Sequence, residues 1–263
     1  MDSIAVGDQE RLFLVHVPTG YESDYPAPLV FNLHGAGSNA LAQENASQWI
    51  QKADEAGFVV VAPQAIEPAR VWLGVFLDDL GDPDIGFFVS MLAELQGELN
   101  IDPDRIYATG LSNGGTMSNR LGCDLSQFFA AIAPVAGAHS GFQLCDVSEP
   151  VSVLAIHGTD DRVIPYEGNG SDVPPVRTWV EAWAARNNCP PESAESEPYS
   201  EVIKETWSGC DGSTTVSLIT VQGGGHSWLG LEFVWEEGRY ATVTTATDEI
   251  WDFFVAHPKS SDG

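Results

Sequence analysis

The sequence is poor in basic residues. Of its 263 residues only 11 are Lys or Arg, against 38 Asp or Glu, which gives a formal net charge of −27. Such a negative field repels nucleic acid and anionic membrane surfaces, so we expect neither as a partner. The excess of carboxylates predicts a heavily hydrated surface. It serves either general solubility or adaptation to high salt, where screening relieves the self-repulsion.

Long hydrophobic runs and low-complexity tracts are also missing. No stretch approaches the roughly 20 apolar residues of a membrane-spanning helix, so we expect a soluble protein. With 43% hydrophobic residues the chain has the composition of a globular protein, which excludes collagen-like, coiled-coil and disordered classes. No linker-like boundary or internal repeat interrupts it. We expect one domain over residues 1–263.

Cysteine is scarce, with four residues that match neither a C-x-x-C redox motif nor tight metal-ligand spacing. Three pairings are open to them. Pairing neighbours, Cys123 with Cys145 and Cys189 with Cys210, would close two loops of about 20 residues, each worth about 3 kcal/mol in the chain-entropy model. That arrangement suits an oxidising compartment. Four buried free thiols are the alternative.

An export signal is not recognisable at the start of the sequence. Met1-Asp2-Ser3 opens with an acidic residue, and the apolar segment of a signal peptide does not follow. We expect either a cytosolic protein or a chain whose leader has been removed, with Met1 added for expression.

Apolar runs alternate along the chain with stretches of helical pattern. The first run alternates apolar and polar residues, and the others are continuously apolar, as in strands buried on both faces of a parallel sheet. We expect strands over 11–18, 29–35, 58–65, 105–110, 130–137, 151–158 and 214–221. We expect helices over 39–56, 84–99, 113–122, 176–187 and 246–256. This order predicts an α/β fold, with a mostly parallel central sheet and helices on both faces.

Three of the expected strands are each followed by a side chain suited to acyl transfer. Along the chain these are a serine, a pair of aspartates and a histidine: Ser112, Asp160 with Asp161, and His226. The carboxyl ends of parallel strands meet at one edge of a sheet, where function is usually placed. The order Ser, Asp, His is that of an α/β-hydrolase.

The serine lies in the pentapeptide Gly110-Leu111-Ser112-Asn113-Gly114, which matches G-x-S-x-G. An apolar strand precedes it and a helical pattern follows, as the sharp strand-to-helix elbow of a nucleophile requires. The helix N-terminus favours developing negative charge beside the serine oxygen. We predict Ser112 as the nucleophile, with a plain Gly-Ser turn as the alternative.

A serine nucleophile needs a base to accept its proton, and six histidines compete for that role. His226 follows a glycine triplet after the last expected strand, where a loop could carry it over Ser112. The other histidines brace turns, lie within a strand, or stand too near the elbow or the carboxyl terminus: His34, His157, His16, His139 and His257. We predict His226 as the base.

The acid and the oxyanion donors are less sharply defined. Spacing alone does not choose between Asp160 and Asp161 as the group that orients the base. In this fold one oxyanion donor is the N–H of the residue after the nucleophile, here Asn113. The second comes from the loop after an early strand, so Ala36 or Gly35 would supply it, and Ala36 is our choice.

Taken together, several blocks resemble the polyhydroxybutyrate depolymerase-type esterases, a group that also contains feruloyl and acetylxylan esterases. The blocks are LHGAGSN (33–39), IDPDRIYATGLSNGG (101–115), AAIAPVAG (130–137), HGTDDRVIPYEG (157–168), WAARNNC (183–189) and GGGHSW (223–228). The resemblance runs from about residue 8 to residue 257. It implies a secreted or periplasmic α/β-hydrolase that cleaves carboxylic esters without a cofactor or a metal.

The resemblance also implies roles for single residues. It makes Ser112 the nucleophile and His226 the base, and the fifth position of H-G-T-x-D-x-x-x-P-Y makes Asp161 the acid. The block W-A-x-R-N-x-C and a later Gly-Cys imply the disulfide between Cys189 and Cys210.

Two tryptophans are implied as substrate-binding residues of the pocket wall, Trp72 and Trp228, with core packing as the alternative for both. The substrate classes implied are short hydroxyalkanoate or polyester esters, hydroxycinnamoyl esters and acetylated xylan, whether small, oligomeric or polymeric. A non-catalytic binding protein on the same shell, or a serine peptidase or acyltransferase, are the rival functions. The sequence leaves the oligomeric state open.

Overall fold

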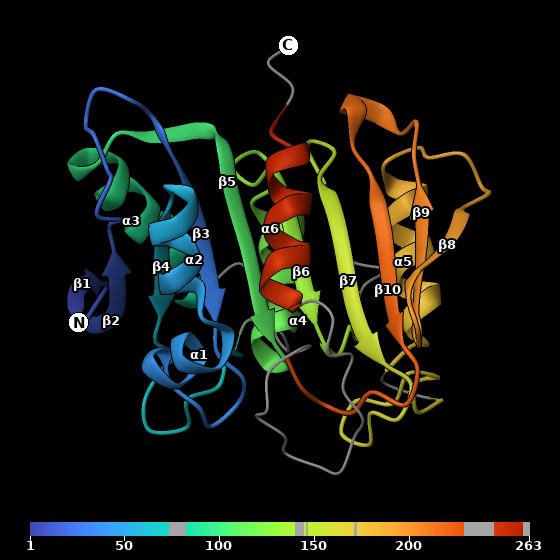
Figure 1. The fold of residues 1–263 in the computed structure, drawn as a ribbon. Coiled ribbons are helices and arrows are strands. Elements are labelled where there is room, and N and C mark those ends of the chain that lie inside the picture. The colour runs from blue at the N-terminus through green and yellow to red at the C-terminus, as the bar shows by residue number, and fades with distance from the viewer. Residues whose placement is uncertain (74–82, 140–144, 146, 171–172, 229–244, 260–263) are drawn as a thin grey trace.

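A ten-stranded sheet forms the centre of the molecule in a computed structural model that describes residues 1–73, 83–139, 145, 147–170, 173–228 and 245–259 (Figure 1). Its strand order is β1-β2-β4-β3-β5-β6-β7-β10-β9-β8. The strands are β1 (Asp2–Val6), β2 (Gln9–His16), β3 (Ala27–Leu33), β4 (Val59–Pro63), β5 (Ile101–Leu111), β6 (Ala131–Val135), β7 (Ser152–Gly158), β8 (Ala194–Tyr199), β9 (Val202–Trp207) and β10 (Val216–Val221). From β4 to β10 along this order the neighbours run parallel, whereas β1, β2, β8 and β9 add antiparallel pairs at the two edges.

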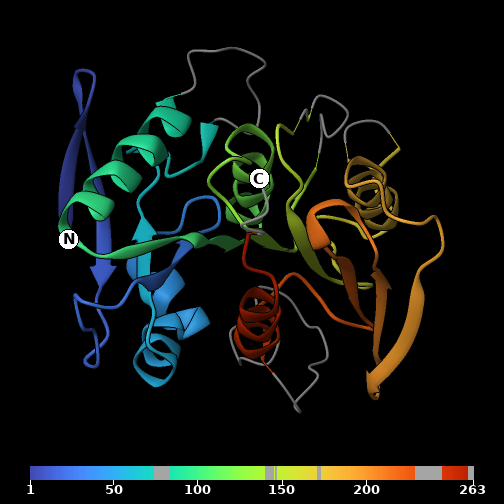
Figure 2. The same ribbon diagram turned by 90° about the horizontal axis from the view of Figure 1, so that it is seen from above.

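Helices cover both faces of this sheet. They are α1 (Ala40–Ser47), α2 (Trp49–Ala56), α3 (Pro83–Glu98), α4 (Asn113–Asp124), α5 (Val176–Arg186) and α6 (Ala246–Ala256). Seen from above, α3, α4 and α5 lie on one face, and α1, α2 and α6 lie on the other (Figure 2). Within the described ranges, no helix is long and apolar enough to cross a lipid bilayer.

The central strands are apolar throughout because both of their faces are buried. In β3, Leu29, Phe31 and Leu33 point into the core shared with α3, α4 and α5. Val30, between them, points into the second core, which the aromatic residues of α2 and α6 fill. The continuous apolar runs therefore reflect two cores, one on each side of the sheet.

The expected α/β architecture is confirmed, with differences in detail. The helix expected over 39–56 is two helices, because Gln48 between them has a φ of 58° and is the C-cap of α1. Strand β5 begins earlier than expected, at Ile101. The edge strands β1, β8 and β9 were not expected at all. Their sequences offered no signal, since β8 (AESEPY) is almost entirely exposed and carries no apolar pattern.

Both disulfides expected from neighbour pairing are present. Cys123, in the last turn of α4, bonds Cys145, and Cys189, just after α5, bonds Cys210. Among the described residues no cysteine is free. The alternative of four thiols is thereby excluded, and the pairing implied for Cys189 and Cys210 is confirmed.

Removing one disulfide should weaken the fold measurably. For the variant Cys189→Ala with Cys210→Ala we expect the free energy of unfolding to fall by about 3 kcal/mol, because the open loop raises the entropy of the unfolded chain. Guanidinium unfolding with and without dithiothreitol measures this. The reductant should shift the midpoint of the wild type further than that of the variant. Equal midpoints for wild type and variant under oxidising conditions would contradict the prediction.

Candidate active site

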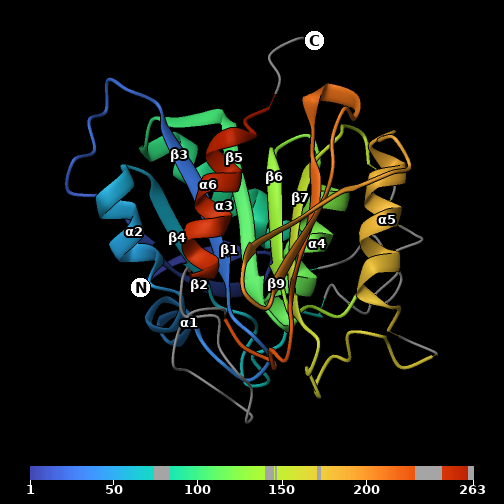
Figure 3. The ribbon, with the colours of Figure 1, turned by 45° about the vertical axis from the view of Figure 1, so that its right-hand side comes forward.

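The carboxyl ends of β3, β5, β7 and β10 point to the same edge of the sheet, the lower edge in Figures 1 and 3. The loops that leave these strands carry all the predicted catalytic residues. Hydrogen bonds tie neighbouring strand ends together, for example from Ser112 N to Val135 O at 2.9 Å and from Ala136 N to Ile156 O at 2.9 Å. The topology thus brings distant parts of the sequence to one edge, as expected for the carboxyl ends of parallel strands.

Ser112 stands at a sharp turn between β5 and α4. Its backbone has φ 57° and ψ −118°, a strained conformation for a residue with a side chain. The flanking glycines are required by packing, because a Cβ on Gly114 would lie 2.2 Å from Leu33 O and one on Gly110 would lie 2.6 Å from the same oxygen. The G-x-S-x-G pattern therefore has the geometry of a nucleophile elbow.

Asp161 and His226 form a buried pair beside this edge. His226 Nδ1 lies 2.8 Å from Asp161 Oδ2, and both side chains are almost fully buried. The other carboxylate oxygen accepts backbone N–H groups from Val163 at 2.9 Å and Ile164 at 2.8 Å. Asp160, which the spacing left open as the acid, is exposed instead. The geometry favours Asp161, as the resemblance implied.

The carboxylate of Asp161 is held in its ionised form. Burial opposes ionisation, but hydrogen bonds from His157 and His226 and from the backbone outweigh it. The pKa of Asp161 therefore stays well below its ordinary value. A permanently ionised acid fixes the proton of the imidazole on Nδ1 and leaves Nε2 of His226 free to accept another.

A second histidine, His157, also reaches the acid. Its Nε2 lies 2.8 Å from Ile164 O and 3.2 Å from Asp161 Oδ2. A carbonyl oxygen only accepts, so Nε2 carries a proton that faces both oxygens. From the sequence we assigned His157 to bracing a turn. It does brace one, and it also contacts the acid, for which its position at the end of a strand gave no signal in the sequence.

The glycine triplet before His226 allows its loop to lie against the loop of the acid. A Cβ on Gly158 would lie 2.1 Å from Gly224 O, so the two loops leave no space for a side chain at Gly158. Two hydrogen bonds join the loops, from Asp160 N to Gly224 O at 2.9 Å and from Gly223 N to Thr159 Oγ1 at 2.8 Å. The base is thus fixed relative to Asp161 from its upstream side.

The serine and the base are not joined in this structure. Within the described residues, no hydrogen bond links the Ser112 hydroxyl to His226. In free enzymes such bonds are often long and tighten when substrate binds. The structure brings together Asp161 and His226 directly, and it places Ser112 at the same edge.

Two backbone N–H groups are available as oxyanion donors. Within the described residues, those of Ala36 and Asn113 have no protein acceptor. The early loop passes close to the nucleophile, since a Cβ on Gly35 would lie 3.5 Å from Ser112 Cβ. The loop that contains Ala36 therefore lies beside Ser112, and Ala36 and Asn113 stay the predicted oxyanion donors.

Comparison with known proteins agrees with this geometry, although no protein-family model matches the chain. Feruloyl esterase B of Piromyces equi is 31% identical over 248 residues, which are 85% of this chain and 45% of that protein. Probable feruloyl esterase C of Aspergillus niger is 28% identical over 255 residues, covering 94% of this chain and 84% of that protein. An acetyl xylan esterase from Aspergillus awamori has the same fold, with a TM-score of 0.68 over 92% of this chain and 93% of the other, at 15% identity.

The chain has the α/β-hydrolase fold, and its sequence is similar to those of proteins named feruloyl esterases. It spans less than half the length of the Piromyces relative, so that protein contains further sequence that this chain does not match.

His34 holds the loop that contains Ala36, the predicted second oxyanion donor, through two hydrogen bonds of its ring. His34 Nδ1 donates to Gly35 O at 2.7 Å, and its Nε2 accepts from Ala65 N at 3.0 Å. Burial is the main cause that lowers the pKa of His34, which keeps the ring neutral and able to accept. His34 therefore braces a turn, as expected.

Trp72 and Trp228 are both buried among the described residues. Trp72 is fully buried and donates from Nε1 to His34 O at 2.9 Å, while its backbone N–H donates to Asn113 Oδ1 at 2.8 Å. Trp228 is 2% exposed and donates to Thr247 Oγ1. The expectation of substrate-binding faces is corrected to core packing, because each indole is enclosed and hydrogen-bonded on the protein side.

A buried polar network surrounds Asn32 in β3, the strand that leads into the loop of Ala36. Asn32, two residues before His34, donates to Glu44 Oε1 at 2.6 Å and to Ser47 Oγ at 2.9 Å, and it accepts from Gln43 at 3.0 Å. Burial raises the pKa of Glu44 to about 7. Its second carboxyl oxygen, Oε2, is buried without a hydrogen-bond partner.

Replacing Glu44 should therefore change how stability depends on pH. Because the folded pKa is about 7 and the ordinary value 4.5, the folded chain binds more protons across that range. Its stability consequently falls as the pH rises through that range, by about 3 kcal/mol. We expect Glu44→Gln, which does not ionise, to match the wild type near pH 5 and to exceed it at pH 8.

Urea unfolding at the two pH values measures this difference. Glu55→Gln is the matched control, since Glu55 lies in the adjacent helix α2 and is exposed. If the difference in unfolding free energy between Glu44→Gln and the wild type were the same at pH 5 and pH 8, the raised pKa of Glu44 would be contradicted.

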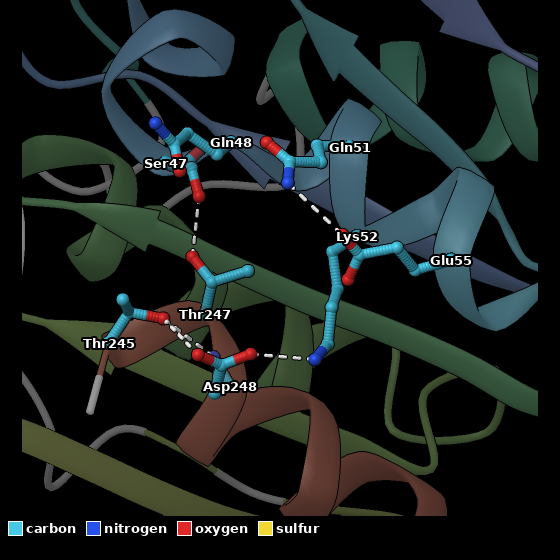
Figure 4. A pocket seen from close by; sticks show the side chains of 8 residues that line it. All are labelled: Ser47, Gln48, Gln51, Lys52, Glu55, Thr245, Thr247 and Asp248. Carbon is cyan, nitrogen blue, oxygen red and sulfur yellow. Dashed lines mark hydrogen bonds and ion pairs between the residues drawn. The ribbon is translucent and has the colours of Figure 1, made fainter. Parts of the chain in front are cut away.

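A polar pocket of about 150 Å³ lies between α2 and the start of α6 (Figure 4). Its lining is Ser47, Gln48, Gln51, Lys52, Glu55, Thr245, Thr247 and Asp248. None of the predicted catalytic residues lines it. Across it Lys52 forms an ion pair with Asp248 at 2.6 Å, so the two charges compensate each other.

Metal ligands do not cluster in the part of the chain that the structure describes: no group of three His, Cys, Asp or Glu residues there could hold an ion. The residues gathered at the sheet edge have the chemistry of a nucleophile, a base and an acid.

Proposed function

We propose that this chain is a serine carboxylic-ester hydrolase that works through an acyl-enzyme. The observation that carries the proposal is the buried contact of 2.8 Å between His226 Nδ1 and Asp161 Oδ2, at the sheet edge where the strained Ser112 elbow stands. This is the arrangement in which an imidazole removes the proton of a serine hydroxyl.

In the first step the Ser112 oxygen attacks the ester carbonyl carbon while His226 Nε2 takes the hydroxyl proton. The N–H groups of Asn113 and Ala36 stabilise the oxyanion. The tetrahedral intermediate then expels the alcohol, which takes the proton from His226, and the acyl group remains on Ser112. In the second step His226 deprotonates a water molecule, the water attacks the acyl carbon, and Ser112 leaves with the proton as the free acid is released.

For the substrate we propose hydroxycinnamoyl esters of the feruloyl type. The support is sequence similarity over most of this chain to two proteins that are named feruloyl esterases. Esters of 3-hydroxyalkanoates and acetylated xylan are the alternatives that the sequence resemblance added. We further propose an oxidising compartment outside the cytosol, since both cysteine pairs form disulfides.

Hydrolysis of a panel of esters tests the proposal. The panel contains p-nitrophenyl acetate, butyrate and octanoate, methyl ferulate, acetylated xylan and a 3-hydroxybutyrate trimer, with Ser112→Ala as the inactive control. We expect methyl ferulate to give the highest kcat/KM among the natural-type esters. Preference for the trimer would transfer the assignment to hydroxyalkanoate esters. If the folded wild type cleaves none of these esters, the proposed esterase activity is wrong.

We also propose that the acidic surface is an adaptation to salt. Several basic side chains already pair with carboxylates, such as Arg177 with Glu205 and Arg120 with Asp124, so most of the 38 acidic residues have no cation to match them. Screening should relieve this repulsion, and we expect the melting temperature to rise with NaCl concentration. A melting temperature that stays constant or falls between low and high NaCl would refute this.

A further inference from the structure

The base is also held from its downstream side, by a tryptophan. Trp228, two residues after His226, is 2% exposed and donates from Nε1 to Thr247 Oγ1 at 3.0 Å. An indole N–H is a donor only, so when it is buried it needs an acceptor at a fixed position. Thr247 is the acceptor, in the first turn of α6.

Thr247 also contacts α1, which lies on the same face of the sheet as α6. Its hydroxyl has one proton, which it donates to Ser47 O in α1 at 2.5 Å, as Figure 4 shows. Ser47 Oγ in turn accepts from Asn32 on β3 at 2.9 Å. All of these side chains are buried. A continuous set of hydrogen bonds therefore runs from the loop of the base to the strand that leads into the oxyanion loop.

The upstream and downstream supports of His226 are independent. Upstream, Gly223 and Gly224 bond to the loop of the acid. Downstream, the Trp228 indole is bound to α6, which belongs to the opposite face of the sheet from α5. Hydrogen bonds thus hold the chain on both sides of His226.

We propose that Thr247 is a positioning residue for the base, which acts on His226 through Trp228; the inference rests on the proposed esterase function. Its hydroxyl accepts from the indole and donates to Ser47 O, and this double contact fixes where the chain leaves His226. Displacements of about 1 Å at a reacting group cost up to about 100-fold in rate, so a smaller shift of the imidazole should lower kcat by about tenfold.

Thr247→Val is the direct test, because valine has nearly the same shape and lacks the hydroxyl. We expect kcat on p-nitrophenyl butyrate to fall about tenfold with KM unchanged, since the substrate contacts themselves stay in place. Thr247→Ser, which restores the hydroxyl, should return kcat to within about twofold of the wild type.

Thr245→Val is the matched control. Thr245 caps the same helix, accepting from Asp248 N at 3.1 Å, and its side chain lines the same pocket (Figure 4). Among the described residues its hydroxyl has no hydrogen bond to Trp228, whose indole donates to Thr247. We expect its melting temperature to fall and its kcat to stay at the wild-type value. The opposite pattern, in which both valine variants lose kcat in proportion to their loss of stability, would show a merely structural role and overturn the proposal.

A double-mutant cycle shows whether Thr247 acts through its hydrogen bond with Trp228 or whether each substitution lowers kcat by a separate loss of structure. Trp228→Phe removes the indole N–H and keeps an aromatic ring, so it should lower kcat by about as much as Thr247→Val. The double variant should be no worse than either single variant, because both remove one interaction. Additive losses would overturn the path through Trp228.

Different results would contradict the proposed esterase function and the positioning role of Thr247. If the wild type cleaves no ester, or if Ser112→Ala keeps its activity, the proposed function itself is wrong. If the wild type is active, Ser112→Ala is inactive and folded Thr247→Val has wild-type kcat, then only the positioning role is wrong.

Discussion

Ser112→Ala should lower kcat on p-nitrophenyl acetate by about 10⁶-fold, to the residual rate that the oxyanion donors alone support. The substitution removes only the hydroxyl group and leaves the Cβ in place, so it adds no bulk at the elbow. Substrate binding should persist, because the donors of Asn113 and Ala36 belong to the backbone. Turnover measured on protein free of wild-type contamination checks the prediction.

Ser227→Ala is the control for that experiment. Ser227 lies next to the base, but no G-x-S-x-G turn surrounds it. It should keep the wild-type rate. Substantial activity in Ser112→Ala, or a comparable loss in Ser227→Ala, would contradict the assignment of the nucleophile.

Asp161→Asn should cost about 10⁴-fold in kcat while the fold is retained. An amide in place of the carboxylate removes the charge that stabilises the imidazolium, and it permits the wrong tautomer of His226. The pKa of Asp161 lies well below its ordinary value, so the wild type should not lose activity through protonation of this group in mildly acidic solution.

The neighbouring aspartate provides the matched control. Asp160→Asn makes the same chemical change one residue earlier, at an exposed side chain whose backbone N–H, not its carboxylate, contacts the loop of the base. We expect kcat within about twofold of the wild type, as for a surface substitution. If Asp160→Asn were the inactive variant, the acid would have to be reassigned.

Much of the fold followed from the apolar runs of the sequence. The parallel strands are buried on both faces, so their sequences had to be apolar throughout, and that pattern is readable. Strand β8 was not readable, because an exposed edge strand needs no apolar residues. The break at Gln48 was also missed, since a positive φ at a glutamine has no sequence signal of its own.

In the candidate site too, some residues could be predicted from the sequence and others could not. The order of Ser112, Asp161 and His226 along the chain and the glycines around them carry strong constraints, so the sequence pointed to them. The roles of Trp72 and Trp228 were misjudged, because their proximity to site residues in sequence does not reveal which way an indole points. Only the structure shows that both donate their N–H groups inward.

Reaction with a fluorophosphonate tests most directly whether Ser112 is an activated nucleophile; it is read out as the intact mass of the protein, followed by peptide mapping. An activated serine displaces fluoride and gains one phosphonyl group. We expect a single adduct on Ser112 that forms rapidly in the wild type and slowly in Asp161→Asn. No adduct on a folded sample, or an adduct on another residue, would contradict the assignment of Ser112.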